Sequence, residues 1–327
     1  MRPTQSSVHV NTPLTVISLA YIQASEEFVA QRVFPVITVE KQSDVYYEFD
    51  RAGFNRLQMQ KRAPGTESTG GAYKVSNEAY FCDVFALHKD IPDQIRANAD
   101  SVLGPDIGAT EFLSQQALLK METDFASDFM KTGVWGKDIS GVASGAVAGT
   151  SVLQWNDNAS SPVENIRAAK VAIKKASGQR GNVLVLGEEV WAALVDHADL
   201  VDRIKGTASP SSPAIVLRQA MAAILELDEI LVMGAIQNSA DEDQTESNAF
   251  IGGKKALLVH RPARPGLMTP SAGYTFAWSG YVGGTLPVAI ERFRMQPLKS
   301  DRIEIEATYD QKKTSSALGY FWDTIVA

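Results

Sequence analysis

The feature that most constrains the fold is a long polar stretch between two segments with strand character. Val45, Tyr47 and Phe49 alternate with Tyr46, Glu48 and Asp50, which is the period of a β-strand. Residues 80–87 (YFCDVFAL) form a second strand-like run, and the residues between the two runs include the flexible sequence PGTESTGG. Loops of that length are uncommon inside compact domains unless they are functional or disordered. The sequence therefore predicts a protruding β-hairpin that carries a basic stretch, Arg51, Arg56, Lys61 and Arg62.

The composition is that of a globular protein. The chain has 327 residues, of which 45% are hydrophobic and 21% charged, and this rules out wholesale disorder, collagen-like repeats and coiled-coil rods. A single cysteine, Cys82, excludes an intramolecular disulfide framework and a multi-cysteine zinc site. The net charge of −7 argues against a protein that grips DNA tightly, because an acidic chain gains little from counterion release. It does not argue against a protein that merely faces DNA.

No stretch of the sequence reaches the roughly 20 apolar residues of a membrane helix, so we expect no membrane partner. Residues 14–22 (LTVISLAYI) are apolar, but the apolar pattern continues through charged residues as far as residue 32. An amphipathic helix over residues 14–32 is therefore predicted in preference to a cleaved signal peptide. Residues 1–12 are polar and aperiodic, which is typical of an arm or tail.

The most regular helix is predicted to open at Pro105-Asp106 and to stop at Gly133. Apolar residues recur in it every four positions, at Leu113, Ala117, Met121, Phe125 and Phe129. Such a helix is about 40 Å long and needs an extended sheet or a partner along its whole apolar stripe. Residues 140–151 (SGVASGAVAGTS) then predict a surface loop or linker.

The second half of the chain alternates helices and strands, which indicates an α/β lobe. A capping box at residues 161–164 predicts a helix that ends at Gly178, and further helices are predicted at residues 188–206 and 213–227. Short strands are predicted at residues 182–186, 230–233, 249–252 and 256–260. Strands at 287–295, 301–310 and 317–325 are predicted to form an antiparallel sheet whose dry face receives the long helix.

No constellation of residues supports catalysis, a metal site or a cofactor. His197 has Asp196, Asp199 and Asp202 near it in sequence, but on a helix these do not converge, and a solvated polar helix face is expected. Residues 241–246 lack the spacing of a calcium loop, and residues 252–255 lack that of a phosphate loop. Cys82, inside an aromatic run, is expected to be a buried inert thiol. The sequence therefore predicts a protein that is not an enzyme.

The order of these parts resembles the major capsid protein of tailed bacteriophages, with the Hong Kong 97-like fold. Local sequence in the second half is similar too, namely NVLVLGEEVWAALVDHADLVDRIKG, ILVMGAIQNSA, FIGGKKALLVHRPARPG and PSAGYTFAW. The resemblance implies an α+β chain with an N-terminal arm (1–40), an extended β-hairpin loop (41–90) and a peripheral domain with a long spine helix (91–160). It further implies an inserted α/β axial domain (161–285) and returning peripheral strands (286–327).

The resemblance also implies what the hairpin does. An isolated two-stranded ribbon is marginal in water, so its apolar side would have to be buried on a neighbouring subunit. Basic side chains in the loop would then meet carboxylates of an acidic neighbour. The residues expected to make this inter-subunit contact are Tyr46, Tyr47, Arg51, Phe54, Arg56, Leu57, Lys61 and Arg62.

As a function, the resemblance implies a coat protein that assembles into hexamers and pentamers of an icosahedral head around double-stranded DNA. The protein would be found in the virion after assembly in the host bacterial cytoplasm, with the DNA contacted weakly and without sequence preference. Portal and decoration proteins are further expected partners. Because the arm starts almost at Met1, we expect a separate scaffolding protein or none. Lys61 or Lys74 could serve in a covalent crosslink, but no acceptor is evident, and assembly without crosslinks is expected.

Three other interpretations remain open at this stage. A cellular nanocompartment of the encapsulin type would share the fold and would need a cargo-binding groove. An α/β enzyme would use the lobe at residues 160–260 and would need convergent titratable side chains. A phage tail or baseplate protein would also assemble, but with a different order of lobes.

Overall fold

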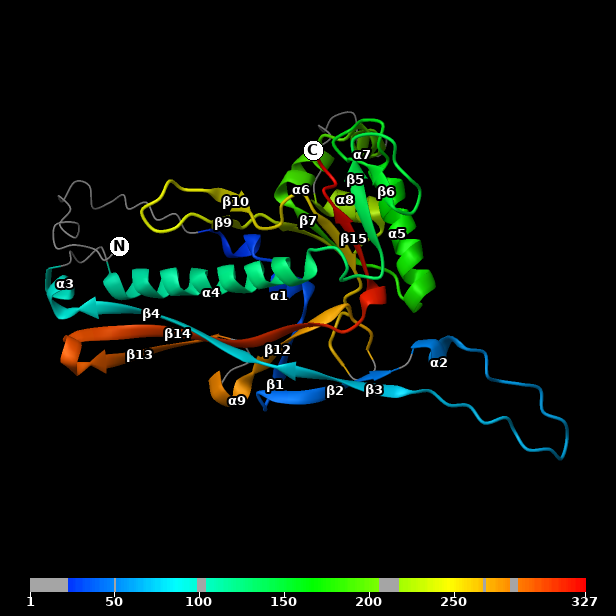
Figure 1. The fold of residues 1–327 in the computed structure, drawn as a ribbon, viewed down its shortest axis with the longest axis horizontal. Helices are drawn as coiled ribbons and strands as arrows, with labels where there is room; N and C mark the ends of the chain where they lie inside the picture. The colour runs from blue at the N-terminus through cyan, green and yellow to red at the C-terminus, as the bar shows by residue number, and fades with distance from the viewer. Residues whose placement is uncertain (1–22, 50, 99–103, 206–217, 267–268, 283–287) are drawn as a thin grey trace.

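The computed structural model describes residues 23–49, 51–98, 104–205, 218–266, 269–282 and 288–327, which form two lobes (Figure 1). The lower lobe in this view is an extended sheet with one long helix lying along it, and the upper lobe is a second sheet flanked by shorter helices. A hairpin loop leaves the lower lobe on the right and projects beyond the rest of the molecule. The α+β fold class predicted from the sequence is confirmed.

The extended sheet has β14 at its centre. Its strands are β1 (Val36–Val39), β4 (Asp83–Pro92), β12 (Gly273–Trp278), β13 (Val288–Met295) and β14 (Ser300–Lys313). β14 pairs antiparallel with β4 on one side and with β13 and β12 on the other, and β1 adds in parallel to β12. The alternation predicted for residues 301–310 is confirmed on one face, where Ile303, Ile305, Ala307 and Tyr309 are buried. That dry face requires a cover.

The cover is the long helix α4 (Pro105–Phe129), which packs on β14 and β4. Leu113, Met121, Phe125 and Phe129 are buried, as the four-residue spacing predicted. The Tyr309 hydroxyl of β14 donates a hydrogen bond of 2.7 Å to Asp124 of α4, which fixes the position of the helix along the strand. At the end of α4, Phe125 and Phe129 pack edge-on against Phe34, and this aromatic group joins the core of the upper lobe. The end of α4 therefore belongs to the upper-lobe core, whereas Leu113 and Met121 pack on β14 in separate clusters.

The far end of the extended sheet is held by a carboxylate between three guanidinium groups. Asp301 accepts hydrogen bonds from Arg292 (2.6 Å), Arg96 and Arg294. These guanidinium groups, Arg292 foremost, keep the pKa of the Asp301 carboxyl far below its ordinary range. Arg96 lies on α3 (Asp93–Asn98) and also pairs with Asp106 in the first turn of α4. The network therefore ties α3, α4, β13 and β14 together.

A second buried carboxylate anchors the chain where it enters the sheet. Glu122 of α4 is fully buried, and its Oε2 accepts hydrogen bonds from the backbone N–H groups of Val29 (2.9 Å) and Ala30 (2.8 Å). These N–H groups open the one-turn helix α1 (Ala30–Val33), which follows the 3₁₀ turn η2 (Ser25–Glu27). Glu122 thus replaces the N-cap side chain that Val29 cannot supply. Burial raises the pKa of Glu122 to about 7.

The upper lobe is built on a six-stranded sheet in the order β6-β5-β15-β11-β7-β8. The strands are β5 (Asp138–Val142), β6 (Ser151–Leu153), β7 (Val183–Gly187), β8 (Glu229–Met233), β11 (Ala256–Val259) and β15 (Gly319–Asp323). β11 runs antiparallel to both of its neighbours, while the other pairings are parallel. Every residue of β7 and β11 is buried, as expected for central strands covered on both faces.

Helices flank this sheet, and smaller elements connect the lobes. The helices are α5 (Pro162–Ser177), α6 (Glu188–Val195), α7 (Ala198–Lys205) and α8 (Arg218–Leu225). The remaining elements outside the long loop are β9 (Ile236–Asn238), β10 (Asn248–Phe250), α9 (Ser279–Val282), η3 (Gln296–Leu298) and η4 (Ser316–Leu318). β9 and β10 form a hairpin that lies above α4 in Figure 1.

Two expectations about the strands are wrong. The third strand predicted for the C-terminal sheet, at residues 317–325, is β15 and pairs with β11 and β5 in the upper lobe, because Phe321 and Trp322 complete that core. The stretch at residues 140–151 is not simply a loop, since its ends belong to β5 and β6. The positions of the domain boundaries, at residues 40, 90, 160 and 285, stay predictions.

Two helix expectations need correction as well, and a third lies only partly within the described residues. Residues 23–32 hold only η2 and most of α1 in place of a continuous helix, and residues 14–22 lie outside the described part. The helix predicted from Ser161 begins at Pro162, but the Ser161 side chain makes no capping bond. For the third predicted helix, the described part begins at α8, since residues 213–217 lie outside it.

The helix predicted at residues 188–206 is interrupted at Asp196-His197, between α6 and α7. His197 is buried and not on a solvated face, which corrects the sequence prediction. Its Nδ1 accepts from the backbone N–H of Asp199 at 3.2 Å, so the proton resides on Nε2, which lies 3.2 Å from the carbonyl of Asp157 and 3.1 Å from Ser160. The imidazole ring therefore supplies a hydrogen-bond acceptor for the backbone N–H of Asp199 at the point where helical pairing is interrupted.

Glu122 predicts a pH dependence of subunit stability. Its pKa rises from 4.5 in an unfolded chain to about 7, so folding favours the protonated acid. The stabilisation is complete below pH 4.5 and is lost as the pH rises to 7, a change of about 3 kcal/mol in the free energy of unfolding. Glu122→Gln mimics the neutral acid and should flatten this profile in denaturant titrations, while Glu111→Gln on the exposed side of α4 should leave it unchanged. Loss of stability at pH 8 in Glu122→Gln would contradict this assignment.

Candidate inter-subunit interface

The projecting loop begins as a two-stranded ribbon. β2 (Ser43–Phe49) and β3 (Val75–Phe81) pair antiparallel, with Ser43 opposite Phe81 at the base and Phe49 opposite Val75 at the far end. A β-hairpin is therefore present, as predicted, but the prediction of its second strand at residues 80–87 is wrong. Only Tyr80 and Phe81 of that run lie in β3, and residues 83–87 belong to β4, which pairs with β14 in the extended sheet.

Aromatic stacking fixes the base of the ribbon to its own subunit. Tyr80 stacks on Phe276 of β12 with ring centroids 4.6 Å apart, and Tyr46 stacks on the same ring at 5.5 Å. Burial of this face raises the pKa of Tyr46 to about 12. Cys82 beside them is also buried, and desolvation raises the pKa of its thiol to about 12, in line with the expected inert cysteine. The ribbon thus leaves the lower lobe in a fixed direction.

The opposite face of the ribbon is apolar and exposed. Val45, Tyr47, Val75 and Phe81 share this face in the strand register, and 48–66% of the surface of each is accessible. A ribbon with one face packed and one face polar would be self-sufficient, but here the second face carries large apolar side chains. The subunit therefore exposes a surface of the kind that marks protein–protein contacts.

Beyond the ribbon, the loop has its own small internal structure. The short helix α2 (Arg51–Asn55) brings Phe54 against Tyr73, with centroids 4.9 Å apart, and Phe49 packs on both rings. The Gln58 side chain spans the loop: its Nε2 donates to the carbonyls of Gly53 and Ala72, and its Oε1 accepts from the N–H of Ala72. These contacts close the loop upon itself and not upon the lobes.

The loop tip is almost entirely exposed. Residues 56–74 contain no helix or strand, and Leu57 and Met59 are 90% and 88% accessible. The segment 51–74 carries five cations against one carboxylate, Glu67. Among the described residues, none of these cations forms an ion pair, and the Arg62 guanidinium donates only to the carbonyl of Thr66. Apolar groups and unpaired cations therefore stand together on a part of the chain that its own subunit does not cover.

The structure divides the eight predicted contact residues into two groups. Tyr46 faces its own subunit, so the strand alternation removes it from the free surface. The remaining seven are on the ribbon's free face or on the loop, namely Tyr47, Arg51, Phe54, Arg56, Leu57, Lys61 and Arg62. Sequence reasoning missed Met59, Tyr73 and Val75. Val75 could have been suspected, because it is an apolar residue next to the predicted hairpin strands. The sequence could not show that Val75 pairs with Phe49 and therefore lies on the same face of the ribbon.

The described residues hold no candidate metal centre. No group of three or more His, Cys, Asp or Glu side chains there could hold a metal ion. Within the same residues, no helix combines the length and apolar character needed to cross a bilayer.

Comparison with known proteins gives the class. Residues 146–276 match the family model described as phage major capsid protein E. The major capsid protein of Burkholderia phage BcepMu is 25% identical over 280 residues, covering 83% of this chain and 84% of its own. A phage-related protein from Bordetella bronchiseptica has a TM-score of 0.67 at 20% identity, covering 91% of this chain and 92% of its own. The capsid of cyanophage P-SCSP1u has a TM-score of 0.60 at 12% identity, with coverages of 94% and 90%.

The architecture is that of the Hong Kong 97-like capsid fold. It combines a projecting ribbon, a long helix on an extended sheet and a second sheet flanked by helices. The chain has the fold of phage capsid proteins, and its sequence is similar to that of phage major capsid proteins. The resemblance inferred from the sequence is confirmed.

The Gln58 contacts predict a local effect of mutation. Gln58→Ala should remove three hydrogen bonds that close the loop, worth about 1 kcal/mol at this half-exposed site, and should speed amide exchange of Ala72 roughly fivefold. The midpoint of global unfolding should not change. Gln60→Ala, an exposed glutamine of the same loop, is the matched control. Equal exchange in both variants would mean that Gln58 does not order the loop.

Proposed function

We propose that this chain is a phage major capsid protein that forms the hexamers and pentamers of an icosahedral head around double-stranded DNA, with the loop at residues 43–81 laid across a neighbouring subunit. The single observation that carries the proposal is the exposed apolar face of the ribbon together with Leu57 and Met59 at its tip. Burial of one such side chain contributes about 1.5–3 kcal/mol, so a handful of them on every subunit is a substantial driving force.

The basic character of the loop supports contact with an acidic surface. On the face of the extended sheet away from α4, Glu291 of β13 lies directly opposite Glu304 of β14, and Glu306 follows two residues later. Like charges in directly opposed positions destabilise a sheet. Cations from the loop of a neighbouring subunit would relieve this repulsion. Arg51, Arg56 and Lys61, which form no ion pair with any described residue, are suitable donors.

The remaining partners follow from charge and from the resemblance. The net charge of −7 suits a lining that contacts packaged DNA weakly and without sequence preference. We propose assembly in the host bacterial cytoplasm, with a separate scaffolding protein or none, and with portal and decoration proteins as further partners. Lys61 and Lys74 are exposed and form no ion pair with the described residues, but assembly without crosslinks is the proposal.

The alternative functions are less well supported. A nanocompartment shell would have the same fold, but the matching family model and the curated relative are both phage capsid proteins. An enzyme in the upper lobe would need convergent catalytic groups, and the structural role of a capsid protein does not call for them.

A loop variant tests the proposed contact. Leu57→Ser combined with Met59→Ser should raise the protein concentration needed for assembly at least tenfold, because two apolar side chains lose their burial. Sedimentation and negative-stain microscopy measure this, and circular dichroism checks the fold. Val147→Ser, which alters an exposed valine of the upper lobe, is the control. Shells formed by the double variant at the wild-type concentration would refute the loop contact.

A second variant separates assembly from folding. Because Phe49 and Val75 are directly paired, residues 50–74 can be replaced by an Asn-Gly turn that closes the ribbon. The shortened subunit should keep its secondary structure and fail to assemble. Unfolding of the whole subunit would instead show that the loop belongs to the subunit core.

A further inference from the structure

The β9–β10 hairpin is a second projecting element, and it is acidic. All six residues of its strands are exposed, and the segment from Ile236 to Phe250 contains Asp241, Glu242, Asp243 and Glu246 but no lysine or arginine. Its base is held by hydrogen bonds between Gln23 and the backbone of Ile236. A two-stranded ribbon of three residue pairs has little stability of its own, so a surface that receives it would stabilise it.

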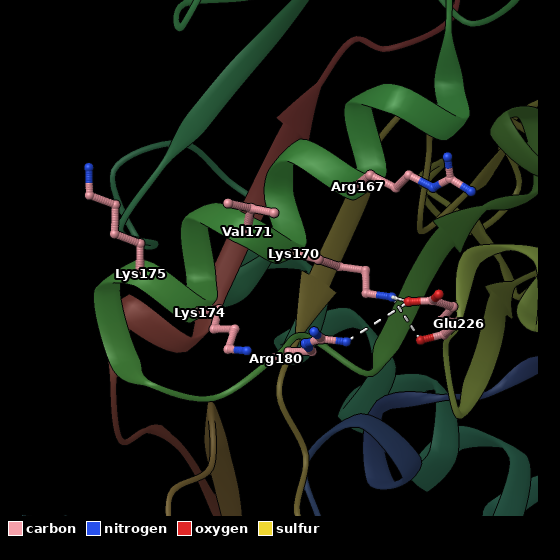
Figure 2. A pocket seen from close by; sticks show the side chains of 7 residues that line it. All are labelled: Arg167, Lys170, Val171, Lys174, Lys175, Arg180 and Glu226. Carbon is pink, nitrogen blue, oxygen red and sulfur yellow. Dashed lines mark hydrogen bonds and ion pairs between the residues drawn. The ribbon is translucent and has the colours of Figure 1, made fainter.

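The helix α5 presents the opposite charge. A pocket beside it is lined by Val171, Glu226 and five cations, Arg167, Lys170, Lys174, Lys175 and Arg180. Figure 2 shows Glu226, from the segment after α8, beside Lys170 of the helix and Arg180 beyond its end, while Arg167, Lys174 and Lys175 extend from the helix in other directions. The attraction of cations to a helix C-terminus accounts for Lys174 and Lys175 in the last turn, but not for Arg167 in the first half.

Only part of this cationic set is engaged within the subunit. Lys170 is buried, and its ammonium donates to the carbonyls of Leu225 (2.6 Å) and Glu226 (2.9 Å), which caps the end of α8. Arg180 reaches the Glu226 carboxylate at only 4.0 Å. Arg167, Lys174 and Lys175 are exposed and form no ion pair among the described residues. Three like charges on one helix repel one another until an anionic group joins them.

The two charged features lie on opposite sides of the upper lobe. In Figure 1 the β9–β10 hairpin extends to the left of the six-stranded sheet, while α5 lies on its right flank. The carboxylates of the hairpin are opposite in charge to the excess of cations in the pocket. Complementary patches on opposite sides of one subunit make a head-to-tail contact, which closes into a ring when the rotation allows.

We propose that the acidic tip of the β9–β10 hairpin of one subunit docks in the α5 pocket of the next subunit around a capsomer. The inference rests on the proposed function, since it specifies a second contact within the hexamers and pentamers. Nucleic acid is a poorer occupant, because a phosphate backbone is usually bound along an extended basic groove, whereas here the cations surround a local depression that also contains Glu226. Charge complementarity of this kind sets register and speeds encounter more than it adds affinity.

Charge reversal in both directions tests the contact. Lys174→Glu with Lys175→Glu reverses the pocket, and Asp241→Lys with Glu246→Lys reverses the hairpin. Each pair alone should raise the concentration needed for capsomer formation at least tenfold at low salt. All four substitutions in one chain should restore it to within about threefold of wild type. Lys137→Glu, an exposed lysine outside the pocket, is the control, and sedimentation velocity is the readout.

The outcomes separate this inference from the proposed function. If both reversed pairs assemble like Lys137→Glu while the Leu57/Met59 variant does not, the loop contact stands and the hairpin contact is refuted. If all of these variants assemble normally, the proposed loop contact falls as well. If the reversed pocket assembles normally but its particles retain less DNA, the pocket serves nucleic acid and the inference is overturned. Failure of the four-substitution chain to recover also overturns it.

Discussion

The structure depends on one constraint: a two-stranded ribbon has two faces, and this subunit can bury only one of them. Tyr46 and Tyr80 stack on Phe276 and fix the ribbon to the lower lobe. The other face, with Tyr47 and Val75, remains in solvent. Water disfavours such a surface strongly enough that association with another copy becomes the way to complete the core. Under the proposed function, a neighbouring subunit covers this second face.

The rest of the molecule makes that exposed face rigid enough to be useful. The aromatic contacts of Phe34 tie the end of α4 to the upper-lobe core, and the Asp301 network holds the far end of the extended sheet. A loop on a mobile base would lose much of its binding free energy to ordering. The loop and the β9–β10 hairpin then have different roles in the account. In the proposed assembly, apolar burial of the loop provides affinity, whereas opposed charges around the upper lobe provide register.

Much of this architecture could be predicted from local patterns. The four-residue spacing of Leu113, Met121 and Phe125 specified the long helix, and the alternation around Ile303 and Ile305 specified β14. Long-range pairing could not be predicted in this way. Residues 319–323 have the same strand character whether they join β14 or β11, and the choice is made by the upper-lobe core. Burial of His197 and the contacts by which Gln58 closes the loop likewise depend on residues that are distant in sequence. In the candidate interface, the sequence predicted that the loop is apolar and basic, but it did not predict which face of the ribbon each side chain lies on. Tyr46, which stacks on Phe276 of its own subunit, is the example.

The most direct test of the account is the reactivity of Met59 toward a methionine oxidant, compared between dissociated subunits and assembled shells. Met59 is 88% accessible in the subunit, whereas Met130 is fully buried and serves as the internal reference. If a neighbour covers the loop, oxidation of Met59 measured by mass spectrometry should be fast in subunits and at least tenfold slower in shells. Equal oxidation of Met59 in both states would contradict the claim that assembly completes the burial of this chain.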